Sequence, residues 1–132
     1  MRRTNRCIFS VLLVAGLVLA LPTQQAVAAT GDDVVLTDFS PGRNVMNAPL
    51  DSSITLTYDQ PIDASSVTGQ TVVIHSNMRG VVPGVYSADG SVVTIDPDQN
   101  FFGGDVVYVI ATNGVADTEG EHPASGTQWQ FS

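Results

Sequence analysis

From residue 54 onward, apolar side chains recur at every second position in short runs that turn residues interrupt. Ile54, Leu56 and Tyr58 alternate with threonines, and such alternation indicates a half-buried β-strand. The three- and four-residue spacing of an amphipathic helix is absent. Turn residues separate the expected strands at intervals of about ten residues. These strands cover residues 34–36, 54–58, 71–75, 81–86, 91–95, 105–112 and 128–131. The pattern predicts an all-β sandwich of about seven antiparallel strands.

The expected strands differ in their predicted positions. Residues 105–112 are apolar on both faces, which is typical of a strand that is central in its sheet or covered by a neighbour. Pro83-Gly84 interrupts an expected strand and predicts an edge or a bulge. Asp89-Gly90 predicts a hairpin turn, because glycine supplies the positive φ that a tight turn requires. Asp63 is expected to cap a single helical turn, and Trp129 is expected in the core.

The first 29 residues predict a cleavable secretory signal peptide. Three arginines precede an apolar run over residues 8–21, and small residues at 26–28 offer cleavage after Ala28 or Ala29. A retained membrane anchor is the alternative, but the run is shorter than the roughly 20 residues that a spanning helix needs. We expect one domain over residues 30–132. The single cysteine, Cys7, lies in the signal segment, so an internal disulfide scaffold is excluded.

Acidic residues dominate the expected domain. The whole chain has 5 Lys and Arg against 13 Asp and Glu, a formal net charge of −8. Three of the five cations precede residue 30, so residues 30–132 keep two cations against all 13 acids, a charge of −11. Because phosphate binding needs clustered Lys and Arg, nucleic acid is excluded as a partner. We interpret the acids as a solubilising surface, with adaptation to saline surroundings as the alternative.

Several segments occur in an order that is typical of one protein family. They are Pro49-Leu50-Asp51-Ser52-Ser53-Ile54, Tyr58-Asp59-Gln60-Pro61-Ile62-Asp63, Val93-Thr94-Ile95-Asp96-Pro97, residues 104–110, residues 114–120 and Trp129-Gln130-Phe131. Together they resemble bacterial Ig-like domains of the S-layer type, the SbsA Ig-like or Big_5 family, from about residue 38 to the last residue. Residues 76–84 depart from the family pattern. The resemblance implies an Ig-like β-sandwich that serves as a spacer or binding module in exported bacterial surface proteins. It does not imply catalysis.

Acidic residues at alternate positions are the candidates for metal binding. Asp117, Glu119 and Glu121 share one expected loop with Gly120, and calcium prefers several oxygen ligands. Their order does not fit an EF-hand. The resemblance implies instead a tight turn in which the aspartate bonds to nearby backbone. We assign no metal and no cofactor, and keep the three residues as weak calcium candidates. A second acidic set consists of Asp96, Asp98 and Asp105.

The two histidines, the adjacent phenylalanines and Tyr108 are further candidates for chemistry or contact. His75 and His122 have no nucleophile motif beside them, so we expect no catalytic residues. Two adjacent aromatics, Phe101 and Phe102, cannot both point inward from a regular strand. We favour a loop that folds both inward, and the alternative is an exposed ring that marks a contact. Tyr108 resembles the buried tyrosine whose hydroxyl pins a loop in many sandwiches.

The sequence therefore predicts a secreted, non-enzymatic Ig-like module with a structural or adhesive role at a bacterial cell surface or outside the cell. The expected partners are other protein domains or cell-surface components. After signal cleavage, membrane is not expected as a partner. The alternative is a ligand-binding module for calcium or a glycan that uses the acidic loops. A small hydrolase is a third possibility, which requires a polar cleft that brings a histidine to a serine.

Overall fold

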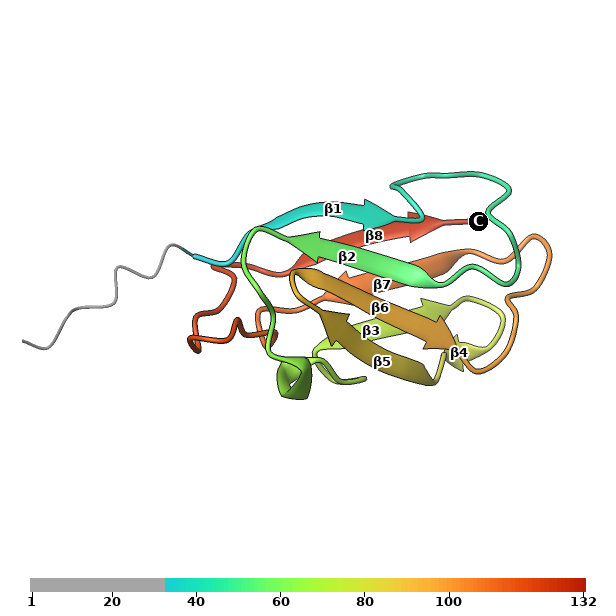
Figure 1. The fold of residues 1–132 in the computed structure, drawn as a ribbon. Coiled ribbons are helices and arrows are strands. Elements are labelled where there is room, and N and C mark those ends of the chain that lie inside the picture. The colour runs from blue at the N-terminus through green and yellow to red at the C-terminus, as the bar shows by residue number, and fades with distance from the viewer. Residues whose placement is uncertain (1–32) are drawn as a thin grey trace, which may run out of the picture.

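A computed structural model describes residues 33–132, which fold into two antiparallel sheets packed face to face (Figure 1). The elements are β1 (Leu36–Ser40), β2 (Ile54–Tyr58), the 3-10 turn η1 (Ala64–Ser66), β3 (Val72–Ser76), β4 (Gly80–Val81), β5 (Gly84–Asp89), β6 (Val92–Pro97), β7 (Val107–Ala111) and β8 (Thr127–Phe131). The expected signal peptide, residues 1–29, lies outside the described residues. Over residues 33–132, no helix is long and apolar enough to cross a membrane.

The strand order confirms the predicted sandwich. One sheet has the order β1-β2-β6-β5 and the other has the order β4-β3-β7-β8. As predicted, β7 is central, because it pairs with β3 on one side and with β8 on the other. The β5–β6 hairpin turns at Gly90 with a φ of 58°, and Asp63 caps η1 by accepting a hydrogen bond from the Ser65 backbone N–H. The sequence therefore predicted the hairpin turn at Gly90 and the cap at Asp63 correctly.

The inward faces of the two sheets form one core, because alternate residues of a strand point to the same side. Ile54 and Leu56 of β2 are fully buried, and Val107 and Val109 of β7 meet them from the other sheet. Burying an aliphatic side chain of this size stabilises the fold by roughly 1.5–3 kcal/mol. Residues 33–132 contain no cysteine, so this core carries the stability without disulfides.

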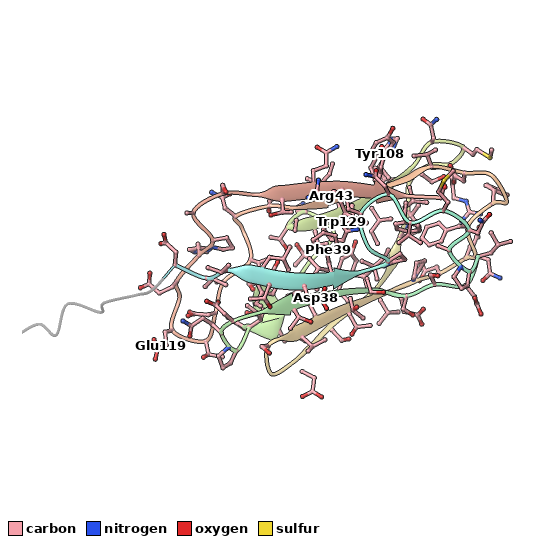
Figure 2. The ribbon with its side chains drawn as sticks, turned by 90° about the horizontal axis from the view of Figure 1, so that it is seen from above. Asp38, Phe39, Arg43, Tyr108, Glu119 and Trp129 are labelled. Atoms are coloured by element: carbon pink, nitrogen blue, oxygen red, sulfur yellow. The ribbon has the colours of Figure 1, made fainter. Side chains whose placement is uncertain are left out.

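Trp129 joins the two sheets at the flank where β1 and β8 lie side by side (Figure 2). Its side chain is buried, as predicted, and its ring centroid lies 4.1 Å from that of Phe39. The indole Nε1 donates a hydrogen bond of 2.9 Å to the Pro41 carbonyl oxygen. Past β1, the Asn44 N–H donates to the Gln130 carbonyl at 2.8 Å. The segment that follows β1 thus covers the outer edge of β8, which protects that edge from further pairing.

The first strand differs from the prediction of residues 34–36. The strand begins at Leu36 and continues to Ser40. Val35 is held by Asp59, whose backbone N–H and Oδ1 pair with the Val35 carbonyl and N–H at 2.9 and 2.8 Å. The register then shifts between Leu36 and Asp38. A bulged edge strand is buried on one side at most, so its apolar residues do not mark its bounds.

The expected strand over 81–86 is two strands in two sheets. β4 pairs with β3, whereas β5 pairs with β6, and buried Val82 lies at the crossing between them. Gly84 begins β5, and a Cβ there would lie 2.6 Å from the Asp96 carbonyl oxygen. The close approach of two backbones therefore requires glycine at this position. The division raises the number of strands in the described residues to eight.

The prediction for Tyr108 is wrong. Its side chain is only half-buried, because it lies on the outward face of β7, and it is drawn at the rim of the molecule in Figure 2. The tyrosine that connects the sheets is Tyr86 of β5, whose hydroxyl donates to the Val72 carbonyl of β3 at 3.1 Å. Alternation along β7 could not show which of its two apolar faces meets the other sheet.

Candidate functional site

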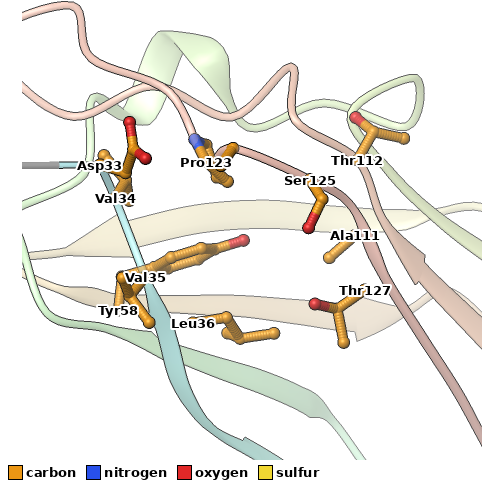
Figure 3. Close-up of a pocket in the computed structure, with 11 residues that line it drawn as sticks. Asp33, Val34, Val35, Leu36, Tyr58, Ala111, Thr112, Pro123, Ser125 and Thr127 are labelled. Atoms are coloured by element: carbon orange, nitrogen blue, oxygen red, sulfur yellow. The ribbon is translucent and has the colours of Figure 1, made fainter.

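A pocket of about 240 Å³ lies where the chain enters the sandwich, between the start of β1 and the segment that joins β7 to β8 (Figure 3). Its walls are largely apolar and include Val34, Leu36, Ala111 and Pro123. The hydroxyls that point toward one another across it come from three residues: Tyr58, Ser125 and Thr127. Among residues 33–132, Asp33 is the only carboxylate in the lining, and no Lys, Arg or His of these residues contributes to it. The pocket is thus a small amphipathic hollow without a fixed cation.

Tyr58 forms the floor of this pocket. The residue is only 3% exposed, and its buried hydroxyl has no hydrogen-bond partner among the described residues. Burial raises the pKa of the Tyr58 hydroxyl to about 12, so the group is a neutral phenol at physiological pH. An unpaired buried hydroxyl costs about 1–3 kcal/mol, and most buried polar groups do have partners. Tyr58 therefore needs an explanation that its place in β2 does not supply.

The acidic loop is organised around Asp117. This carboxylate is buried, and its Oδ1 accepts the backbone N–H groups of Glu119 and Glu121, each at 2.8 Å. Gly120 closes the turn with a φ of 91°, and Glu119 points outward (Figure 2). The alternation that suggested calcium ligands thus coincides with an aspartate turn of the kind that the resemblance implied. Over residues 33–132, no three His, Cys, Asp or Glu side chains lie where they could share a metal ion.

The second acidic set is likewise dispersed. Asp105 is buried, and its carboxylate accepts hydrogen bonds from the Ser76 hydroxyl and, at 3.2 Å, from the Met78 backbone N–H. Asp96 accepts from the Ser53 hydroxyl at 3.2 Å, and Asp98 is exposed. Asp105 therefore ties the β3–β4 turn to the segment before β7, which is a structural task.

The two histidines lie on different parts of the sandwich. His75 is exposed on β3. His122 is exposed in the loop before β8, where its Nδ1 lies 2.9 Å from the Val115 carbonyl oxygen. Neither lines the pocket at Tyr58.

The two adjacent phenylalanines split between core and surface, so the prediction that both fold inward is wrong. Phe101 is buried and meets Phe131 edge to face, with ring centroids 5.5 Å apart. Phe102 is 47% exposed, and the Arg79 guanidinium lies over its ring, 4.6 Å from the centroid. The two residues lie in the loop between β6 and β7 and their rings point to different sides, so Phe102 remains available for contact.

A family model described as a bacterial Ig-like domain matches residues 30–132. The chain belongs to this family. The Ig-like domain is similar in structure to CopC from Methylosinus trichosporium OB3b, with a TM-score of 0.55 and 16% identity over 74% of this chain and 90% of that chain. It is also similar to the S-layer protein rSbsC(31-844), with a TM-score of 0.56 and 14% identity over 76% of this chain and 13% of that chain.

A third neighbour is the N-terminal part of the bacterial S-layer protein SbsC, with a TM-score of 0.54 and 13% identity over 76% of this chain and 24% of that chain. The Ig-like domain thus spans a small part of these S-layer chains. No curated protein matches the sequence. Likeness at this level of identity shows the fold, and function has to be argued from the surface of this domain.

The sequence did not reveal the pocket of the Ig-like domain. Tyr58 completes the alternation that predicts β2, and nothing in that alternation distinguishes it from Ile54 and Leu56. The residues that face its hydroxyl across the pocket, Ser125 and Thr127, are far away in the chain. The hollow over Tyr58 forms because the start of β1 and the segment between β7 and β8, which are distant in the chain, lie on either side of it.

Proposed function

We propose that this Ig-like domain is a secreted, non-enzymatic module with a structural or adhesive role at the bacterial surface. One observation carries the proposal. The first described residues and the last residue lie at opposite ends of the long axis of the sandwich (Figure 1). This arrangement suits a rigid spacer. The polar groups that first suggested chemistry, Asp117 and Asp105, are occupied by hydrogen bonds that fix loops.

Five large apolar side chains are exposed around the exit of the chain, and we call this surface the apolar end: Val45, Met46, Leu50, Met78 and Phe102. Met46, Leu50 and Phe102 line one hollow of about 290 Å³ together with Ser132. Exposed apolar clusters mark interaction sites, and aromatic residues, Met and Arg are enriched at protein interfaces. Arg79 over Phe102 completes that composition. The apolar end is therefore the surface through which the module contacts a protein partner.

The opposite end has a different character. Seven acids lie on the segments around the chain entry: Asp33, Asp59, Asp63, Asp89, Asp117, Glu119 and Glu121. Neither arginine of the described residues lies among them. Charge of one sign keeps a surface hydrated and opposes association with other acidic surfaces. The domain thus has one end with exposed apolar side chains and one end dominated by acidic side chains.

Replacing Phe102 with serine should weaken binding of the labelled protein to the surface of the bacterium that produces it. We expect an affinity loss of at least about tenfold, because a central aromatic residue commonly dominates an interface. Val92→Ser is the matched control, since Val92 is 37% exposed beside the Asp89-Gly90 turn at the opposite end and does not line the pocket at Tyr58. Equal binding by both variants and the unaltered protein would exclude the apolar end as the contact surface.

The second candidate function is a ligand-binding module for calcium or a glycan that uses the acidic loop, and a thermal melt tests its calcium form. We expect the same Tm in EDTA and in millimolar calcium at constant ionic strength, because the Asp117 carboxylate already accepts two backbone N–H groups. Ionic strength must be constant because the net charge responds to any salt. A rise of several degrees with calcium and not with magnesium would favour the second function, since a ligand that binds only the folded state stabilises it.

A further inference from the structure

We propose that the pocket over Tyr58 binds a compact, uncharged ring that carries a hydroxyl group, either as a free phenol or as the tyrosine side chain of a partner. This site lies at the chain entry, away from the apolar end. It is therefore independent of the contact that we propose there.

The unpaired hydroxyl points to a ligand with a hydrogen-bonding atom. Tyr58 is 3% exposed, and its hydroxyl, which has no hydrogen-bond partner among the described residues, is aimed at the hollow (Figure 3). The hydroxyls of Ser125 and Thr127 face it across the pocket. Because a hydroxyl both donates and accepts, three such groups around one space suit a ligand hydroxyl that does the same.

The apolar walls of the pocket determine what the body of the ligand can be. Val34, Leu36, Ala111 and Pro123 offer apolar surface, which suits a hydrocarbon body and leaves most hydroxyls of a sugar ring unpaired. An apolar cavity of about 150 Å³ in another protein holds benzene, so about 240 Å³ admits a substituted ring.

Charge excludes anions from the same space. The part of the chain that the structure describes contributes no Lys, Arg or His to the lining, and Asp33 is the only carboxylate that it contributes. Tyr58 remains neutral because burial raises its pKa. A carboxylate or phosphate would enter without a counter-charge, at a large cost in desolvation.

Titration of the protein, expressed from its full sequence, tests the site by NMR with four probes: p-cresol, N-acetyltyrosinamide, benzoate and glucose. We expect saturable shifts at Ala111 and Thr127 with p-cresol, and none with benzoate or glucose. N-acetyltyrosinamide binding as tightly as p-cresol identifies a side chain of a partner as the source. Binding of p-cresol alone identifies a free phenol.

The variants Tyr58→Phe and Thr127→Val each remove one hydroxyl with little change of shape. Each should weaken p-cresol binding by about fivefold, the effect of losing one hydrogen bond, while Tyr108→Phe, which lies outside the pocket, should bind normally. The proposal is overturned if neither p-cresol nor N-acetyltyrosinamide gives saturable shifts, if benzoate or glucose binds better, or if both hydroxyl variants bind p-cresol as tightly as the unaltered protein.

Discussion

Replacing Trp129 with alanine should lower the free energy of unfolding by about 4 kcal/mol, because it removes a buried indole and leaves a cavity between the sheets. The ring stacks on Phe39 and its Nε1 donates to the Pro41 carbonyl. Losing it therefore separates β1 from β8 at the flank where no ladder hydrogen bonds join the two sheets. A domain of this size has a total stability of about 5–15 kcal/mol, so the variant should lose between about a quarter and four fifths of it.

Urea unfolding followed by far-UV circular dichroism measures this effect. Fluorescence is unsuitable, because Trp129 is the single tryptophan of the chain. Trp129→Phe is the matched control, since it keeps an aromatic ring against Phe39 and loses only the indole donor and part of the volume. We expect it to cost about 2 kcal/mol. An alanine variant that loses less than about 1 kcal/mol would show that the flank is not joined through this ring.

Replacing Asp105 with alanine should cost about 3 kcal/mol, because it removes a buried side chain and leaves the buried Ser76 hydroxyl and the part-buried Met78 backbone N–H without their acceptor. Its carboxylate accepts from the Ser76 hydroxyl and the Met78 N–H, and the Ser76 oxygen in turn accepts the Arg79 N–H at 2.9 Å. These bonds set the turn after β3, which carries Met78 and Arg79 to the apolar end. The same change should therefore also weaken binding to the cell surface.

Thermal and urea unfolding measure the loss at Asp105, with Asp98→Ala as the control. Asp98 is an exposed acid in the neighbouring loop, and its removal should change stability by no more than about 0.5 kcal/mol. Equal effects of the two substitutions would mean that the charge of the loop, and not the buried network, matters. Asp105→Asn should lie between them, because an amide oxygen still accepts one of the two bonds.

Local patterns predicted the inner strands of both sheets, because a strand with a neighbour on each side has a regular pattern of buried residues. The alternation of Ile54, Leu56 and Tyr58 placed β2 correctly, and the apolar run in residues 105–112 identified the central strand β7. The edge segments β1 and β4–β5 escaped prediction, whereas the edge strand β8 was predicted correctly because Trp129 and Phe131 alternate into the core. The strand β1 begins late, and Gly84 divides one expected strand between two sheets.

Candidate sites depended on contacts between segments distant in the chain, which a single sequence does not display. Acidic alternation at Asp117 was visible, but a turn and a metal site share that pattern, and only the hydrogen bonds from Glu119 and Glu121 show the turn. Likewise, Tyr86 rather than Tyr108 connects the sheets, because the choice of inward face depends on how the sheets pack.

Photo-crosslinking on living cells tests the proposed role of the apolar end most directly. A photoreactive phenylalanine analogue is placed at position 102, at the apolar end, or at position 119, in the exposed acidic loop. We expect a covalent adduct with another protein from position 102 and none from position 119. Adducts from position 119 alone, or from neither position, would contradict a module that acts through its apolar end.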